Sequence, residues 1–309
     1  MRNVFLGTSA FAAAVLERLA ASPHSPQLVV SRPDRPAGRG RRLTAPPVAE
    51  AARFLGLDLI QPDDLHAPES LERIAAAAPE ALCVCAYGVL IREPLLSAYE
   101  LLNVHPSLLP RWRGAAPIER ALLAGDADTG VSIMHLVEAL DAGPVGLQAR
   151  EAIRGDDDAG TLGKRLQVLG GDLLVQALEQ RPPFHDQPPE GITYAGKIEA
   201  RDRAIDPGGT ASAEERRVRA LRPHVGARLH LPDGSALGVR RARLAGPGGE
   251  PSTLSAVEGR LLLGCRDGAL ELLEVQPPGG RAMPADDWLR GRAGAALASS
   301  PLRLAPPPS

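Results

Sequence analysis

The stretch NVFLGTSAFAAAVLERLAASPHSPQLVVS, residues 3–31, contains the pattern that decides the fold of the first half of the chain. Residues 3–7 are apolar and end in glycine, as short buried strands do. Residues 11–21 show apolar side chains at helical spacing, and residues 26–31 return to a β-rich run. The apolar face of that helix comprises Phe11, Val15, Leu16 and Leu19. A strand, a helix and a strand in this order predict a βαβ unit with parallel strands.

The same alternation continues to about residue 137. It predicts an α/β domain with a mostly parallel sheet that is covered by helices on both faces. In such a sheet, ligands bind at the carboxyl ends of the strands. Further strands are predicted at residues 57–60, 81–88, 101–105 and 130–137, and helices at residues 48–55, 69–78 and 115–124.

The composition changes towards the second half of the chain. Residues 160–180 predict a long amphipathic helix, and the four prolines of residues 181–190 are typical of a linker. After about residue 207, short apolar runs alternate with PDG, GPGG and RDG turns. This pattern predicts antiparallel strands in a small barrel of the OB type. We therefore expect a first domain at residues 1–186, a linker at 187–206 and a second domain at 207–309.

Composition and charge are those of a soluble globular protein. The chain has 309 residues, of which 44% are hydrophobic and 23% charged, and its net charge is −2. Residues 207–309 carry 14 arginines against 10 acidic residues, a weak indication of a polyanionic partner. Three cysteines without a CxxC pair fit a reducing compartment. Because neither a signal peptide nor an apolar run of membrane-spanning length is present, we expect a cytoplasmic protein with no membrane partner.

The segment NVHPSLLPRWRG, residues 103–114, places polar residues at the end of a predicted strand. Side chains alternate along a strand, so Asn103 and His105 face the same side. An imidazole can act as a base or an acid, and an amide N–H can donate to a developing oxyanion. The alternative is a polar pair that caps the strand end.

A carboxylate follows the next predicted strand. Asp141, in LDAGPV at residues 140–145, could orient His105 and accept a proton, or it could cap its own turn. His135 lies inside an apolar run, and we interpret it as structural, with Cys83 and Cys85 as core residues. The sequence contains neither a nucleophile elbow, nor metal-spaced His and Cys residues, nor a dinucleotide-binding glycine motif. These features favour direct transfer between two bound substrates with acid–base and oxyanion assistance.

A basic segment, RPDRPAGRGRR at residues 32–42, follows the second predicted strand. It has five arginines and one acidic residue, and its prolines and glycines predict a loop at the same edge of the sheet as the polar pair. Arginines in such a loop suit phosphate groups. The alternative is a solvated basic loop.

With these residues assembled, the chain resembles the methionyl-tRNA formyltransferase family from residue 1 to about residue 292. The long block at residues 103–134 is similar to folate-dependent formyltransferases in general, whereas the basic loop and the second domain resemble the tRNA-acting branch. The motifs are FLGTSAFA (5–12), RPDRPAGRGRRL (32–43), AYG (86–88), NVHPSLLPRWRGAAPIERALLAGDADTGVSIM (103–134), LDAG (140–143), TYAGKI (193–198) and LEVQPPGGRAM (273–283).

The resemblance implies a Rossmann-like formyltransferase domain followed by an OB-like domain. It implies formyl transfer from 10-formyltetrahydrofolate to the α-amino group of methionyl initiator tRNA. We expect no metal and a monomeric protein. The implied catalytic residues are Asn103, His105 and Asp141. The implied folate contacts are Ser107, Leu108, Leu109, Pro110, Ala139, Leu140, Gly143 and Pro144, and the implied tRNA contacts are Arg39, Arg41 and Arg42.

Two alternatives remain at this point. A formyltransferase for a sugar nucleotide or for glycinamide ribonucleotide would share Asn103, His105 and Asp141, but it would not need the basic loop or a basic second domain. A non-catalytic RNA-binding protein with a decayed transferase domain would not need those three residues. Folate binding separates the second alternative from an enzyme.

Overall fold

The computed structural model describes residues 1–37, 41–246, 249–291, 297 and 300–306. The chain forms two compact units. The first comprises residues 1–117, 128–152 and 163–195, and the second comprises residues 118–127, 153–162 and 196–309.

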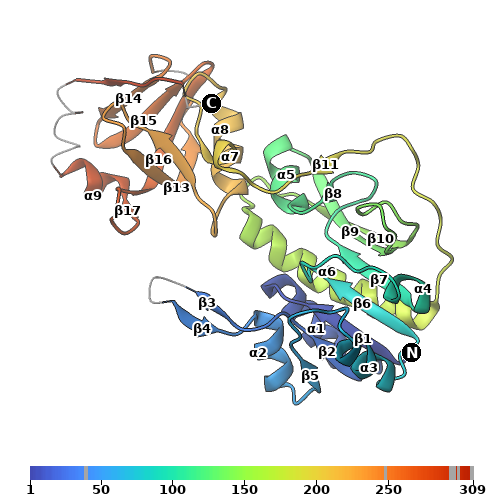
Figure 1. Cartoon of the computed structure of the whole chain (residues 1–309). Coiled ribbons are helices and arrows are strands. Elements are labelled where there is room, and N and C mark those ends of the chain that lie inside the picture. Colours follow the sequence, from blue (N-terminus) through green and yellow to red (C-terminus); the bar gives the residue numbers. More distant parts are fainter. Residues whose placement is uncertain (38–40, 247–248, 292–296, 298–299, 307–309) are drawn as a thin grey trace. The chain divides into compact units, whose positions relative to one another are not determined.

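The first unit is built on a seven-stranded sheet with the order β10-β9-β7-β6-β1-β2-β5 (Figure 1). Its five parallel strands are β1 (Asn3–Gly7), β2 (Leu28–Val30), β5 (Leu59–Ile60), β6 (Ala81–Cys85) and β7 (Glu100–His105). The predicted βαβ unit is confirmed, since α1 (Ala10–Ala20) joins the parallel pair β1 and β2. Ser9 caps α1 by accepting a hydrogen bond from the Ala12 amide.

The edge of this sheet departs from the parallel pattern. Strands β9 (Asp128–His135) and β10 (Val145–Ala152) run antiparallel, β9 to β7 and β10 to β9. Strand β10 is not among the strands predicted from the sequence. Only residues 136–144 connect β9 to β10, and a parallel crossover needs about a dozen residues or more. The short connection therefore turns the chain back and leaves Asp141 in the turn.

Helices cover both faces of the sheet. The long helix α6 (Ala159–Gln180), as predicted, packs through Gly170 on Val104 and Val131. On the other face, a core cluster joins α3 (Pro68–Ala76) and α4 (Leu95–Ala98) to strand residues such as Leu82 and Leu101. Two further helices lie in the first 195 residues: α2 (Pro47–Phe54) in the first unit, and α5 (Pro117–Ala124), whose residues 118–124 belong to the second unit.

Two short strand pairs accompany the main sheet. The hairpin of β3 (Arg35–Ala37) and β4 (Arg42–Thr44) carries the basic segment. The parallel pair of β8 (Arg113–Gly114) and β11 (Tyr194–Ala195) fixes the segment after β7 to a part of the chain about 80 residues later. Residues 181–195 thus return along the first unit and belong to it.

The second unit is an antiparallel sheet with the order β12-β13-β16-β15-β14-β18, and β17 pairs with β16 (Figure 1). The predicted meander of short antiparallel strands is confirmed. Alternating apolar residues such as Leu229, Leu237, Leu254 and Leu270 form its core. From residue 196 onward its elements are α7 (Ala200–Arg203), α8 (Ala211–Ala220), β12 (Ala227–His230), β13 (Ala236–Leu244), β14 (Thr253–Val257), β15 (Arg260–Cys265), β16 (Gly268–Gln276), β17 (Met283–Pro284), α9 (Ala285–Leu289) and β18 (Leu302–Arg303).

The fold is therefore α/β, with a mostly parallel Rossmann-like sheet followed by a curled antiparallel sheet, as predicted. Among the described residues, no helix is both long and apolar enough to cross a membrane.

Candidate active site

The site begins at the carboxyl end of β7. Asn103 and His105 alternate with Val104, whose side chain packs against α6, so both polar side chains face the opposite side of the sheet. They are buried, with 8% and 4% of their surfaces exposed. Parallel strands of such a sheet end where ligands bind. The strand thus presents an amide and an imidazole together at its carboxyl end.

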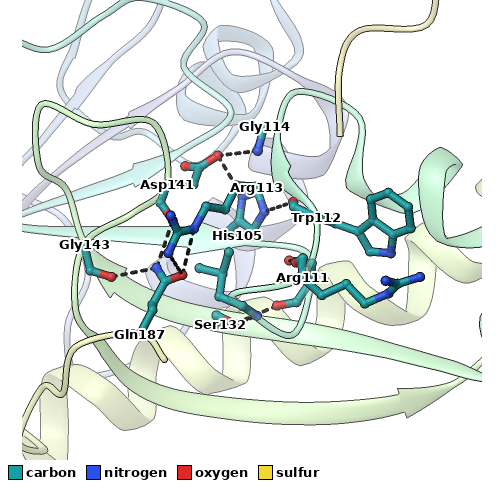
Figure 2. Close-up of polar contacts among 11 residues, drawn as sticks. His105, Arg111, Trp112, Arg113, Gly114, Ser132, Asp141, Gly143 and Gln187 are labelled. Carbon is teal, nitrogen blue, oxygen red and sulfur yellow. Dashed lines mark hydrogen bonds and ion pairs between the residues drawn. The ribbon is translucent and has the colours of Figure 1, made fainter. Parts of the chain in front are cut away.

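The structure brings His105 and Asp141 together, as the sequence predicts. The distance from His105 Nδ1 to Asp141 Oδ2 is 3.7 Å (Figure 2). The other ring nitrogen, Nε2, lies 2.8 Å from the carbonyl oxygen of Trp112. Because a carbonyl can only accept, Nε2 carries a hydrogen and donates it. Nδ1 is therefore the ring nitrogen that faces the carboxylate.

Asp141 is placed by backbone contacts. Its Oδ2 accepts a hydrogen bond of 2.8 Å from the Gly114 amide. Its own backbone has a φ of 46°, the left-handed region that non-glycine residues seldom adopt. The His135 amide donates to the Pro144 carbonyl, which closes the β9–β10 turn. At Gly143 a Cβ atom would lie 2.0 Å from the His135 carbonyl oxygen, so only glycine fits there.

Two residues that the sequence analysis left without a site role complete this turn (Figure 2). Gln187 Nε2 donates to the carbonyl oxygens of Asp141 and Gly143, each at 2.8 Å. Arg113, buried with 8% exposed, donates to Gln187 Oε1 through Nε at 3.0 Å and Nη2 at 2.7 Å. Gln187 lies in the proline-rich segment that composition identifies as a linker, so no local pattern could have indicated this contact.

The SLLP turn is fixed by two polar residues of the antiparallel strands. Ser132 Oγ donates to the Ser107 carbonyl and accepts from the Leu109 amide at 3.1 Å. Gln148 Nε2 donates to the Leu109 carbonyl at 2.8 Å and to Ser132 Oγ at 2.9 Å. Neither residue was predicted as part of the site, because each lies inside a strand whose pairing does not follow from the sequence pattern.

The predicted folate residues lie on two segments that flank the His105–Asp141 pair along the chain. Ser107 and Leu109 are buried, and the Ser107 hydroxyl donates to the Arg111 carbonyl. Leu140 is 64% exposed, whereas Gly143 is buried in the turn. Leu108, Pro110 and Pro144 are half-buried, and Ala139 is exposed.

The predicted tRNA residues lie on the β3–β4 hairpin or outside the described residues. Arg41, with a φ of 46°, and Arg42 are exposed, beside Leu43, which is 70% exposed. Arg39 lies outside the described residues.

The remaining candidates have contacts within the fold. Cys83 and Cys85 are buried in β6, as predicted, and burial raises the pKa of the Cys83 thiol to about 12. His135 Nε2 lies 3.1 Å from Glu100 Oε1, and its ring stacks on Phe184 with centroids 3.6 Å apart. In the part of the chain that the structure describes, no group of three His, Cys, Asp or Glu side chains could hold a metal ion.

Comparison with protein families agrees with this geometry. Residues 1–178 match the formyl transferase family, and residues 197–293 match the formyl transferase C-terminal domain. Fold and site together thus define a two-domain formyl transferase.

Curated relatives specify the family further. Methionyl-tRNA formyltransferase of Halorhodospira halophila is 44% identical over 299 residues, covering 94% of this chain and 96% of the relative. The protein of that name from Thermus thermophilus is 45% identical over 296 residues, with the same coverage. The chain belongs to the methionyl-tRNA formyltransferase family.

The fold is shared with more distant structures. HypX of Aquifex aeolicus, solved in complex with tetrahydrofolic acid, superposes with a TM-score of 0.63 at 18% identity. The alignment covers 94% of this chain and 47% of HypX, so the chain spans about half of that protein.

Proposed function

We propose that this protein transfers the formyl group of 10-formyltetrahydrofolate to the α-amino group of methionyl initiator tRNA. Membership of the family supports the reaction. The observation that carries the mechanism is the buried His105–Asp141 pair beside Asn103 at the carboxyl end of β7. The product is N-formylmethionyl-tRNA, which serves translation initiation.

The first step is attack of the methionyl α-amine on the formyl carbon, which forms a C–N bond and places negative charge on the formyl oxygen. The Asn103 amide and the protonated His105 ring stabilise that charge. Because His105 Nε2 donates to the Trp112 carbonyl, its Nδ1–H is the donor that serves the reaction. The Trp112 carbonyl thus fixes the orientation of the imidazole ring, and Nδ1–H is left to donate to the oxyanion.

The second step moves a proton and breaks a bond. The attacking nitrogen loses a proton, N10 of the folate gains one, and the bond between the formyl carbon and N10 breaks. The Asp141 carboxylate, 3.7 Å from His105 Nδ1, orients the imidazole ring. It also carries the proton from the attacking amine nitrogen to N10 of the folate.

The folate co-substrate contacts two segments in this proposal. The turn of Ser107, Leu108, Leu109 and Pro110 lies on one side, and Ala139, Leu140, Gly143 and Pro144 help to enclose the pterin. The exposed Leu140 side chain offers an apolar surface to a flat ring, and turn carbonyls and amides offer hydrogen bonds. The buried Ser107 and Leu109 act by shaping the turn.

The tRNA contacts both units in this proposal. Arg39 probes the acceptor end, and Arg41 and Arg42 bind phosphates, which set affinity more than sequence choice. We assign the formyltransferase domain to residues 1–186, the linker to 187–206, of which residues 187–195 return along the first unit, and the tRNA-docking domain to 207–309. The protein acts as a monomer in the cytoplasm, where charged initiator tRNA occurs.

A basic cluster supports the docking role of the second unit. Burial lowers the pKa of Arg203, and the nearby Arg228 and Arg240 lower it further. The bonded partners of Arg203 and Arg240 are neutral: the carbonyls of Gly226 and Val225, and Gln276 Oε1. Like charges gathered in this way suit a polyanion such as tRNA.

One assay tests the function. The protein is incubated with 10-formyltetrahydrofolate and with methionine charged on either initiator or elongator tRNA. Formylation of the initiator form is expected, with little or none of the elongator form. Equal formylation of both would contradict the assigned tRNA preference, and formylation of neither would contradict the activity.

A further inference from the structure

The β9–β10 turn holds Asp141 in a conformation that its own backbone disfavours. A left-handed φ of 46° at a non-glycine residue costs about 1 kcal/mol and persists only where neighbours maintain it. The Asp141 carboxylate accepts from Gly114, but that bond constrains the side chain rather than the turn. The backbone of the turn is held by the hydrogen bond from the His135 amide to the Pro144 carbonyl, which leaves the carbonyls of Asp141 and Gly143 for a further contact.

Gln187 provides that contact. Its side-chain amide has two donor hydrogens, and the carbonyl oxygens of Asp141 and Gly143 each take one at 2.8 Å (Figure 2). The two carbonyls lie on either side of Ala142. A single amide therefore clamps the segment that carries the carboxylate.

Arg113 sets the orientation of this amide. A guanidinium only donates and a carbonyl only accepts, so the amide meets all four contacts only with Oε1 toward Arg113 and Nε2 toward the turn. The cation also polarises the amide and strengthens its N–H donors. The buried guanidinium thus acts on the turn through Gln187.

The segment of residues 112–114, which contains Arg113, contacts both members of the candidate catalytic pair, His105 and Asp141. The Trp112 carbonyl accepts from His105 Nε2, and the Gly114 amide donates to Asp141 Oδ2. The segment is itself held by Thr193, which accepts from the Trp112 and Arg113 amides at 2.9 Å. Residues 187–193 therefore fix both the strand that positions His105 and the turn that positions Asp141.

We propose that Gln187, oriented by Arg113, is a positioning residue that holds the Asp141 carboxylate against His105. This inference rests on the proposed function of that pair. Neither Gln187 nor Arg113 touches the reacting atoms. Their effect is on the separation and orientation of the two catalytic side chains.

Gln187→Glu is the sharpest test. Glutamate would pair with Arg113 at least as well as glutamine, but it has no hydrogen to donate to the two turn carbonyls. We expect the single-turnover rate, measured with both substrates saturating, to fall on the order of 10- to 100-fold. We expect KM for tRNA and for folate to stay within about threefold, and the pH profile of the rate to shift.

Two further variants separate the contacts. Gln187→Met keeps the length of the side chain without its hydrogen bonds, and its single-turnover rate should fall as much as that of Gln187→Glu. Arg113→Lys keeps the positive charge but not the pair of hydrogen bonds to Gln187 Oε1. We therefore expect a smaller fall in the single-turnover rate than in the Gln187 variants, with a shift of the pH profile in the same direction. The matched control is Gln176→Glu, which adds the same charge at an exposed position of α6 and should leave rate and profile unchanged.

The possible outcomes are distinct. A wild-type protein that does not formylate methionyl-tRNA would contradict the proposed function itself. With an active wild type, the positioning role is overturned when both Gln187 variants keep the wild-type rate. It is overturned as well when their loss follows only a reduced folded fraction, measured by thermal unfolding, with the pH profile unchanged.

Discussion

Asn103 places a side-chain amide on the strand face that carries His105. In the proposed mechanism this amide donates to the oxyanion that forms when the amine attacks. Removing one such donor costs roughly 3–4 kcal/mol in comparable sites. Asn103→Ala should therefore lower turnover on the order of a hundredfold. Thermal unfolding should show an intact fold, and near-normal turnover would contradict the assignment.

Gly143 is required by a close approach of two backbone segments. A Cβ atom at this position would lie 2.0 Å from the carbonyl oxygen of His135, a residue held by its pairing with Leu102 of β7 and by the hydrogen bond from its amide to the Pro144 carbonyl. In Gly143→Ala the turn must shift, and Asp141 moves with it. We expect the rate of formyl transfer to fall on the order of a hundredfold, because misplacement by about 1 Å has that effect.

The control for this variant is Gly155→Ala. A Cβ atom at Gly155 would have no neighbouring atom within 4 Å, and the residue has no left-handed φ, so alanine fits there. Rates near the wild-type value in both variants would show that the turn tolerates displacement.

At the scale of elements, three strands of the second unit meet at one carboxylate. Glu271 on β16 is buried and accepts from Arg243 on β13 at 2.9 Å and from Arg260 on β15 at 2.5 Å. The hydrogen bond from Arg260 is the main reason that the pKa of Glu271 lies below its ordinary value of 4.5. A lowered pKa stabilises the fold above the ordinary value, and this stabilisation is lost as the pH falls below it.

Glu271→Gln should therefore lower the free energy of unfolding at pH 7 by only about 1 kcal/mol, since water screens the two arginine side chains, which are 62% and 43% exposed. The difference from wild type should shrink as the pH falls from 5 to about 3, as measured by urea unfolding. Glu274→Gln on the same strand is the control. A difference that stays constant with pH would contradict the ionic origin.

The β3–β4 hairpin presents Arg42 to solvent. As a phosphate contact, Arg42 should affect tRNA binding and leave folate binding alone. We expect Arg42→Ala to raise KM for methionyl-tRNA roughly 3- to 10-fold without a change in KM for folate. Arg73→Ala, which removes an exposed arginine paired with Asp58 at 2.9 Å, serves as the control. Equal changes in both KM values would contradict the assignment.

Helices and strands whose apolar periodicity and boundaries are visible within a short stretch could be predicted from the sequence. The strand of residues 3–7 and the helix of residues 160–180 are observed within a residue, because periodicity and glycine boundaries are local properties. Strand β10 could not be predicted in this way. Its pattern is weak since it lies at the sheet edge with its side chains partly exposed, and its antiparallel direction follows from the short turn before it.

The candidate site also contains residues that could be predicted from local sequence patterns and residues that could not. Asn103 and His105 share a strand, so their common face follows from alternation. Gln187 contacts partners 44 and 46 residues away in the chain, and Ser132 is a small polar residue within an apolar strand. Contacts of this range depend on the tertiary fold, and no spacing rule predicts them.

At the scale of the whole molecule, the charge distribution gives the last prediction. The net charge is −2, yet Arg203, Arg228 and Arg240 gather in the second unit, and Arg228 is exposed. Each phosphate that the protein neutralises releases counterions, so kcat/KM for tRNA should fall as salt rises. Arg228→Ala should lower kcat/KM at low salt. It should also reduce the slope of log kcat/KM against log salt concentration by about 1.

The matched control for Arg228→Ala is Arg303→Ala in the same unit. Arg303 also carries one positive charge, but it pairs with Glu250 at 2.7 Å and is already neutralised. Its loss should leave the slope unchanged, because an arginine paired in this way releases few counterions. If both variants reduce the slope equally, net charge rather than the cluster governs tRNA docking. If neither does, the phosphate contacts lie elsewhere, and the docking role of this cluster is wrong.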